Sequence, residues 1–211
     1  MGTAVVELTT ACEILGAEPP IFLGYEDSGM IGEPENDNPN CFWQADHDEA
    51  VERLSAILTD VDADVLTIYD PNGGYGHPDH IQVHRVGLAA AKSCGIEHVY
   101  ESTINRTRAL EMIAQAKELG LFAEDAEAPD IEGDDSFGML EADISFDVDV
   151  SDVATEKKAA IAAHRSQVGP DSFFLAMPDE VFVHVFGSES FALPGVRGTG
   201  GPQAVAVLPG L

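Results

Sequence analysis

The chain reads Tyr69-Asp-Pro-Asn-Gly-Gly-Tyr-Gly-His-Pro-Asp-His80 between an apolar run and a helical pattern. The apolar run, Val65-Leu-Thr-Ile-Tyr69, is typical of a buried strand bounded by turn residues. Three glycines follow, which allow the backbone to turn sharply or to approach a ligand. Pro78 then suits the first turn of a helix. Open α/β sheets bind their ligands where a strand ends in such a loop and a helix begins, so the stretch predicts a ligand site.

Helices and strands are predicted to alternate along the whole chain. We expect helices over residues 3–15, 46–58, 79–94, 106–119 and 153–164, and strands over 21–24, 65–69, 98–100, 143–150 and 181–186. This alternation is typical of a three-layer, Rossmann-like α/β fold with a mostly parallel sheet. We place one α/β domain over residues 1–192 and a loosely held Gly/Pro-rich tail over residues 193–211. Residues 121–140 are acidic and predict a surface excursion.

The charge and composition of the chain narrow its partners and its compartment. Ten Lys and Arg against 38 Asp and Glu give a formal net charge of -28. Such a surface repels nucleic acid and anionic membranes, so neither is expected as a partner. The acidity fits either a high-salt host or simple solubility. Three cysteines without CxxC spacing, no apolar run of about 18 residues and no secretory layout predict a cytoplasmic protein with free thiols.

Three histidines gather in and after the Gly-rich loop. His80 and His84 are four residues apart on the predicted helix, and His77 precedes them. With Asp79, they offer the imidazole and carboxylate ligands that zinc or another divalent metal takes. The alternative is a helix start where Asp79 complements the dipole and the histidines are incidental. His84 by itself fits a supporting or surface position better than a ligand.

Two further residues could serve a catalytic site. Tyr75 precedes His77 by two residues, and its phenol could donate to a developing oxyanion; the alternative is a packed loop aromatic. Asp27, in the segment Asp27-Ser-Gly-Met30, could bind sugar hydroxyls. An Asx-type turn explains Asp27 equally well.

Three segments resemble one known family. They are the Gly-rich stretch 69–80, the segment Leu23-Gly-Tyr-Glu-Asp-Ser-Gly-Met30, and the helix from Lys158 that ends in His-Arg-Ser-Gln167. Together they resemble the PIG-L/LmbE-like zinc N-deacetylases, and within these the mycothiol-pathway deacetylases and amidases. The resemblance spans most of residues 5–186 and implies the LmbE-like α/β fold.

The resemblance also implies an activity and roles for individual residues. The activity is zinc-dependent removal of an acyl group from an N-acyl amino sugar of N-acetylglucosaminyl type. His80 is implied as a zinc ligand, His77 as a stabiliser of the tetrahedral transition state, and Tyr75 as a group that polarises the amide carbonyl. Asp79 would orient its neighbours at the metal.

The small-molecule partner implied by the resemblance is the amino sugar itself. Asp27 and Met30 would face the sugar. Association of identical chains is left open by the sequence.

The chain departs from the family at one motif. Family members begin with a strand that ends in a His-Pro-Asp-Asp-like motif, which supplies two more zinc ligands and the general base. The His-Pro-Asp of this sequence is the one at residues 77–79. We therefore expect an N-terminally truncated fold without its first strand, inactive alone, with an exposed sheet edge prone to association. The competing hypothesis is an inactive remnant or a carbohydrate-binding pseudoenzyme of the same fold.

Overall fold

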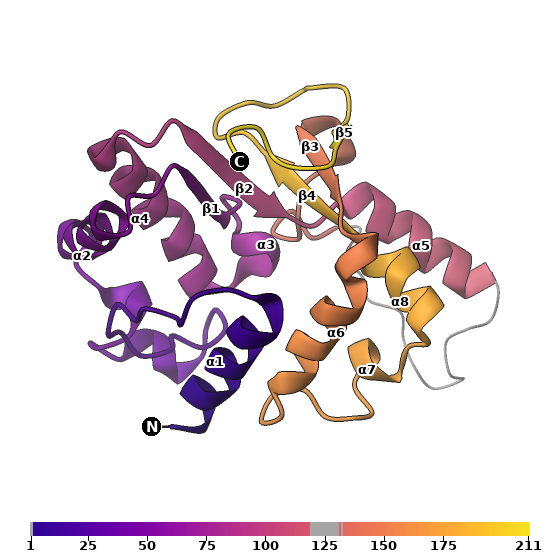
Figure 1. Ribbon diagram of the computed structural model, residues 1–211, viewed down its shortest axis with the longest axis horizontal. Helices are drawn as coiled ribbons and strands as arrows, with labels where there is room; N and C mark the ends of the chain where they lie inside the picture. The colour runs from indigo at the N-terminus through magenta and orange to yellow at the C-terminus, as the bar shows by residue number, and fades with distance from the viewer. Residues whose placement is uncertain (1, 119–130, 132) are drawn as a thin grey trace. The chain divides into compact units, whose positions relative to one another are not determined.

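A computed structural model describes residues 2–118, 131 and 133–211 of the chain (Figure 1). Much of the acidic segment predicted as a surface excursion, residues 121–130 and 132, lies outside the described residues. The chain forms two compact units. The first comprises Met1–Phe22 with Asp149–Glu189, and the second comprises Leu23–Val148 with Ser190–Leu211.

The second unit is a mixed α/β structure built on an open sheet. Its helices and strands are α2 (His47–Asp60), β1 (Val65–Tyr69), α3 (Gly73–Gly76), α4 (Pro78–Cys94), β2 (His98–Thr103), α5 (Arg106–Glu118), β3 (Phe146–Asp149), β4 (Ser188–Ala192) and β5 (Gln203–Val205), with 3-10 turns at Pro34–Asp37, Phe42–Gln44 and Glu141–Asp143. The strands described form one five-stranded sheet in the order β1-β2-β4-β3-β5. β1 and β2 are parallel, as are β3 and β5, whereas β2 and β4 are antiparallel. The predicted α/β class is confirmed.

The parallel pair β1 and β2 positions the Gly-rich loop. Their register sets Val65 opposite His98 and Tyr69 opposite Ser102, so the two strands end side by side. Helix α4 returns along both strands, and it packs very closely at Gly87. A Cβ built on Gly87 would lie 2.5 Å from Cγ2 of Ile68, so only a glycine lets the helix approach β1 to this distance.

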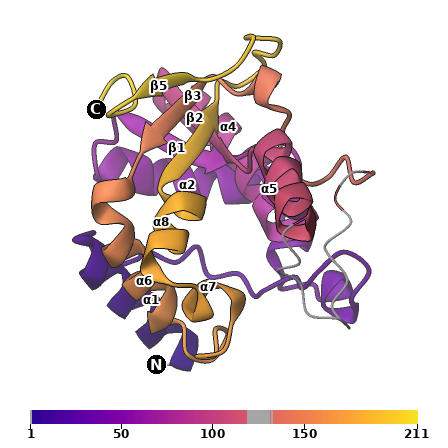
Figure 2. The ribbon, with the colours of Figure 1, turned by 90° about the vertical axis from the view of Figure 1, so that its right-hand side faces the viewer.

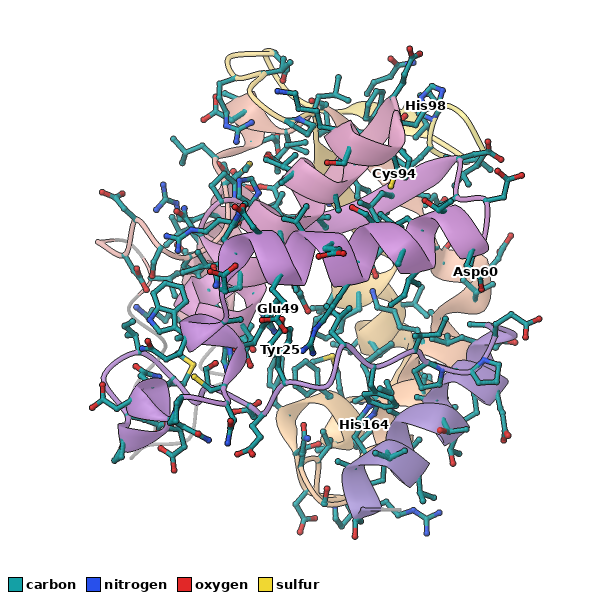
Figure 3. The ribbon with its side chains drawn as sticks, turned by 90° about the vertical axis from the view of Figure 1, so that its left-hand side faces the viewer. Tyr25, Glu49, Asp60, Cys94, His98 and His164 are labelled. Atoms are coloured by element: carbon teal, nitrogen blue, oxygen red, sulfur yellow. The ribbon has the colours of Figure 1, made fainter. Side chains whose placement is uncertain are left out.

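Helices α2 and α4 of the second unit begin and end within two residues of the predicted bounds. The Asp46 carboxylate caps α2 by accepting the Glu49 N–H at 3.0 Å, as a capping residue should. Pro78 opens α4, and Gly95 closes it in the left-handed conformation. Figure 3 looks onto α2 and labels Tyr25 and Glu49, which Arg53 connects: its guanidinium lies over the Tyr25 ring and pairs with Glu49.

The first unit is helical. It contains α1 (Thr3–Leu15), a 3-10 turn at Ser151–Val153, α6 (Ala154–Ala163), α7 (Phe173–Ala176) and α8 (Asp179–Phe186). Helix α1 packs against α6, as both ribbon views show (Figure 2). The Glu7 carboxylate of α1 accepts the N–H of Ser166 at 2.8 Å and its hydroxyl at 2.5 Å. This bond ties the first helix to the chain segment that follows α6.

Three predictions about local structure were wrong. Residues 181–186 form most of α8 instead of a strand, because Pro178 and two acidic first-turn residues start a helix there. Residues 21–24 form no strand, and Ile21 is 60% exposed. The Gly/Pro-rich segment from residue 193 is not loose, since β5 pairs with β3 and the Tyr100 hydroxyl donates to the carbonyl oxygen of Pro209. The domain boundary at residue 192 stays a prediction.

None of the helices in the described part of the chain has the length and apolar character needed to cross a membrane.

Candidate active site

A buried carboxylate at the end of β1 holds the Gly-rich loop in shape. Oδ1 of Asp70 accepts the N–H groups of Asn72 at 2.8 Å and of Gly74 at 3.0 Å, and Oδ2 accepts the Thr103 hydroxyl from the end of β2. Asp70 is fully buried, and a buried carboxylate needs such donors. The loop also requires glycine, because Gly73 has a φ of 67°. The ends of the two parallel strands therefore shape the loop directly.

His80 presents a neutral imidazole with one defined lone pair. Its Nδ1 lies 3.0 Å from the carbonyl oxygen of Gly73. A carbonyl only accepts, so Nδ1 carries the proton and Nε2 keeps the lone pair. The ring stacks on Tyr69 with centroids 3.9 Å apart, and burial lowers the pKa of His80 from its ordinary value. A carbonyl-bonded, neutral imidazole of this kind is suited to binding a metal ion.

His77 shows the opposite arrangement of its two ring nitrogens. Its Nδ1 accepts the backbone N–H of Asp79 at 3.2 Å and so caps α4. In the neutral ring the proton then sits on Nε2, which can donate to a ligand. The rings of His77 and His80 have centroids 4.9 Å apart. The loop and the helix start thus place one donor and one acceptor imidazole side by side.

Tyr75 lies beside both histidines and keeps its phenol proton. Its ring meets His77 edge-on at 6.3 Å and His80 at 5.1 Å between centroids. Partial burial and the nearby charge of Asp27 raise the pKa of Tyr75 above its ordinary value. The hydroxyl is therefore a hydrogen-bond donor at neutral pH. Tyr75 remains partly exposed, at 43%, so a ligand can reach it.

Asp27 forms the predicted Asx-type turn and also acts electrostatically on Tyr75 and His80. Its Oδ1 accepts the Gly29 N–H at 2.8 Å. After burial, its charge adds to the raised pKa of Tyr75, and it partly opposes the lowering that burial causes in the pKa of His80. The two interpretations of Asp27 are thus compatible. Met30 follows in the same loop and is 38% exposed.

Asp79 points its carboxylate at the Asp27–Met30 loop. Oδ2 accepts the N–H of Ser28 at 3.2 Å, and Oδ1 accepts the Ser28 hydroxyl in a short bond. Sequence reasoning did not single out Ser28, which is fully buried. Its place between two candidate sugar contacts was the available signal. Asp70 was also missed, although a carboxylate directly after a buried strand is a typical ligand-site position.

His84 supports the fold beneath the site. Its Nδ1 lies 3.1 Å from the carbonyl oxygen of Tyr69 and 3.6 Å from Oε1 of Glu101. Glu101 is 1% exposed, and its other oxygen pairs with Arg197 at 3.0 Å. Burial raises the pKa of Glu101, while Arg197 and His84 oppose that shift. His84 therefore joins α4 to the first two strands.

The residues described do not assemble a complete catalytic metal site. No group of three or more His, Cys, Asp or Glu side chains placed to hold a metal occurs within residues 2–118, 131 and 133–211. A catalytic zinc takes three protein ligands and leaves one position open. His80 fits as one of these ligands, but the described residues do not supply the other two at the same place.

Comparisons with known proteins place the chain among de-N-acetylases. Residues 3–91 match the PIG-L family, described as GlcNAc-PI de-N-acetylase. A 1D-myo-inositol 2-acetamido-2-deoxy-alpha-D-glucopyranoside deacetylase from Acidothermus cellulolyticus is 36% identical over 209 residues, which are 95% of this chain and 70% of that protein.

Relatives with the same name occur in other organisms. The one from Geodermatophilus obscurus is 36% identical over 94% of this chain and 73% of its own length. The one from Streptomyces avermitilis is 36% identical over 98% of this chain and 76% of its own length. The similarity thus extends over nearly the whole chain, including both units. The chain belongs to the PIG-L family of de-N-acetylases, which are hydrolases.

Proposed function

We propose that this chain carries the substrate-binding and oxyanion-stabilising part of a zinc-dependent N-acetylglucosaminyl deacetylase. The observation that carries the proposal is the gathering of Tyr75, His77 and His80 around one loop, with the Asp27 carboxylate close to them. The names of the relatives supply the substrate: a glucosamine, N-acetylated at position 2 and linked to inositol.

The acetamide oxygen accepts two hydrogen bonds in this proposal. Nε2–H of His77 and the hydroxyl of Tyr75 are the donors: the capping bond at Nδ1 leaves the proton of the neutral His77 ring on Nε2, and the raised pKa of Tyr75 keeps its phenol proton. Donors held in place before the reaction stabilise the negative charge that develops on a carbonyl oxygen during hydrolysis. The capping bond of His77 and the fixed loop of Tyr75 hold these donors in place.

The sugar binds beside the loop that carries Asp27 and Met30. The Asp27 carboxylate accepts hydrogen bonds from sugar hydroxyls, and the exposed thioether of Met30 packs against the ring. In this proposal the sugar lies with its acetamide toward the loop that carries Tyr75 and His77.

Zinc is the metal in this proposal, with Nε2 of His80 as one ligand. Bound zinc would lower the pKa of its water and polarise the carbonyl. The described residues do not bring three such ligands together, so the steps assigned here are those of the chain's own donors.

A graft into an active relative tests these roles. Residues 23–103 of this chain replace the aligned segment of the Acidothermus cellulolyticus relative. We expect the graft to be active, and His77→Ala or Tyr75→Phe to lower kcat by about 10²–10³, the usual cost of one oxyanion donor. Zinc content, measured by atomic emission, should stay unchanged. Tyr100→Phe, which removes a phenol bonded to Pro209 in this chain, is the control. Loss of zinc in His77→Ala would make His77 a ligand instead.

Metal content in the same graft separates the two helix histidines. His80→Ala should lose most of the bound zinc, because Nε2 of His80 is free to bind it. His84→Ala should keep the zinc, because the His84 ring lies against the buried Glu101 carboxylate, with Nδ1 3.6 Å from Oε1, whereas the His80 ring lies beside Tyr75 and His77. Equal zinc loss in the two variants would contradict the assignment of His84.

A carbohydrate-binding protein without turnover is the second candidate function. Two observations favour it. The described residues do not assemble a full set of metal ligands, and the Asp27–Met30 loop, which would bind the sugar, is held in place by hydrogen bonds. Binding of the N-acetylated sugar by a graft that retains zinc but does not hydrolyse the sugar would support this candidate over the enzyme.

A further inference from the structure

Ser28 lies at a junction of three chain segments. Its N–H and hydroxyl both donate to the Asp79 carboxylate, and its Oγ accepts the backbone N–H of Trp43 at 2.9 Å. Its carbonyl oxygen accepts from the Asn36 amide. Ser28 is 0% exposed, and all its polar groups are bonded.

Asp79 connects this junction to the catalytic helix. It stands in the first turn of α4, directly before His80, and its own N–H donates to Nδ1 of His77. One residue therefore binds the loop through its side chain and a histidine through its backbone. Hydrogen bonds to a charged carboxylate are about twice as strong as neutral ones, so the connection is stiff.

We infer that Ser28 is a positioning residue for sugar recognition, which through Asp79 fixes Asp27 and Met30 relative to His80. Small changes in the loop would otherwise displace the sugar contacts from the reacting group, and misplacement by about 1 Å can cost 10²-fold in rate. The inference rests on the proposed function, because that function assigns Asp27 and Met30 to the sugar. The bonds of Ser28 themselves do not depend on it.

Amide hydrogen exchange in the unliganded chain tests the connection. In Ser28→Ala, we expect the amides of Gly29 and Asp79 to exchange about tenfold faster, because the loop and the helix start lose their common anchor. Ser145→Ala is the matched control: Ser145 is also buried, and its Oγ accepts the Leu193 N–H at 3.1 Å. The control should leave both amides unchanged. If Ser28→Ala does not fold, Asp79→Asn removes part of the same bonding and gives the same readout.

Sugar binding tests the role in recognition. The probe is 1D-myo-inositol 2-acetamido-2-deoxy-alpha-D-glucopyranoside, followed by the fluorescence of Trp43, the single tryptophan of the chain. Ser28→Ala should weaken binding about tenfold, and much less in an Asp27→Ala background, because residues that act through one another are not additive.

The two experiments distinguish failure of the Ser28 inference from failure of the proposed function. Unchanged amides in Ser28→Ala would overturn the inference, as would an effect on sugar affinity that adds in full to that of Asp27→Ala. Faster amides in a chain that does not bind the sugar would instead overturn the proposed function, and with it the assignment of Ser28 to recognition.

Discussion

Expressed alone and supplied with zinc, these 211 residues should not hydrolyse the N-acetylated inositol glucosaminide above the uncatalysed rate. Within the described residues, no group of three metal-binding side chains forms. A catalytic zinc requires about three protein ligands, and His80 offers one. Without a firmly bound metal, no activated water is present to attack the acetamide, whose oxygen His77 and Tyr75 would stabilise.

The measurement is release of the free amine, with the Acidothermus cellulolyticus relative assayed in parallel. A zinc titration of the chain alone should likewise show weak binding. Turnover comparable to that of the relative would mean that the chain completes the site by itself.

Gly73→Ala should destabilise the second unit and disturb His80. Gly73 has a φ of 67°, and a Cβ there would lie 2.7 Å from Cβ of His80 and 2.9 Å from the Ile81 nitrogen. The left-handed conformation costs about 1–2 kcal/mol for a residue with a side chain, and forced overpacking adds about 1–3 kcal/mol. We expect the free energy of unfolding in urea to fall by roughly 3 kcal/mol or more.

Gly95→Ala is the matched control for this substitution. Gly95 has a φ of 73°, and no atom lies within 4 Å of a Cβ built on it. Its loss should therefore be limited to the backbone cost of about 1–2 kcal/mol. In the graft, only Gly73→Ala should also lower zinc content. Equal destabilisation by the two alanines would show that His80 yields freely to a side chain at position 73.

The loop and its flanking elements could be predicted from sequence because the signals are local. The glycines permit the tight turn, Pro78 favours the start of a helix, and the apolar run around Ile68 indicates a buried strand, each within a few residues. Local signals conflict in the run 181–186. Its alternating valines fit a strand, whereas Pro178 and the acidic residues that follow it start a helix, and the helix is what forms. Period alone does not separate a buried strand from a short helix in six residues.

The bonds that organise the site were beyond local reasoning. Ser28 and Asp79 are 51 residues apart in the chain, and Asp70 and Thr103 are 33 apart. These residues meet because α4 and β2 pack against β1, and the register of that packing cannot be predicted from local sequence patterns. Sequence resemblance could suggest which residues act, whereas the structure adds which neighbours hold them.

The close approach of α4 to β1 at Gly87 makes the spacing between helix and strand part of the active site. His80 lies two turns before Gly87 on the same helix, so we expect a side chain at position 87, which would meet Cγ2 of Ile68, to shift α4 and His80 with it. The contact between Gly87 and Ile68 would thus set the position of His80 from a point outside the Gly-rich loop. Variation at position 87 should therefore be tolerated only when Ile68 becomes smaller with it, and the two positions would change as a pair.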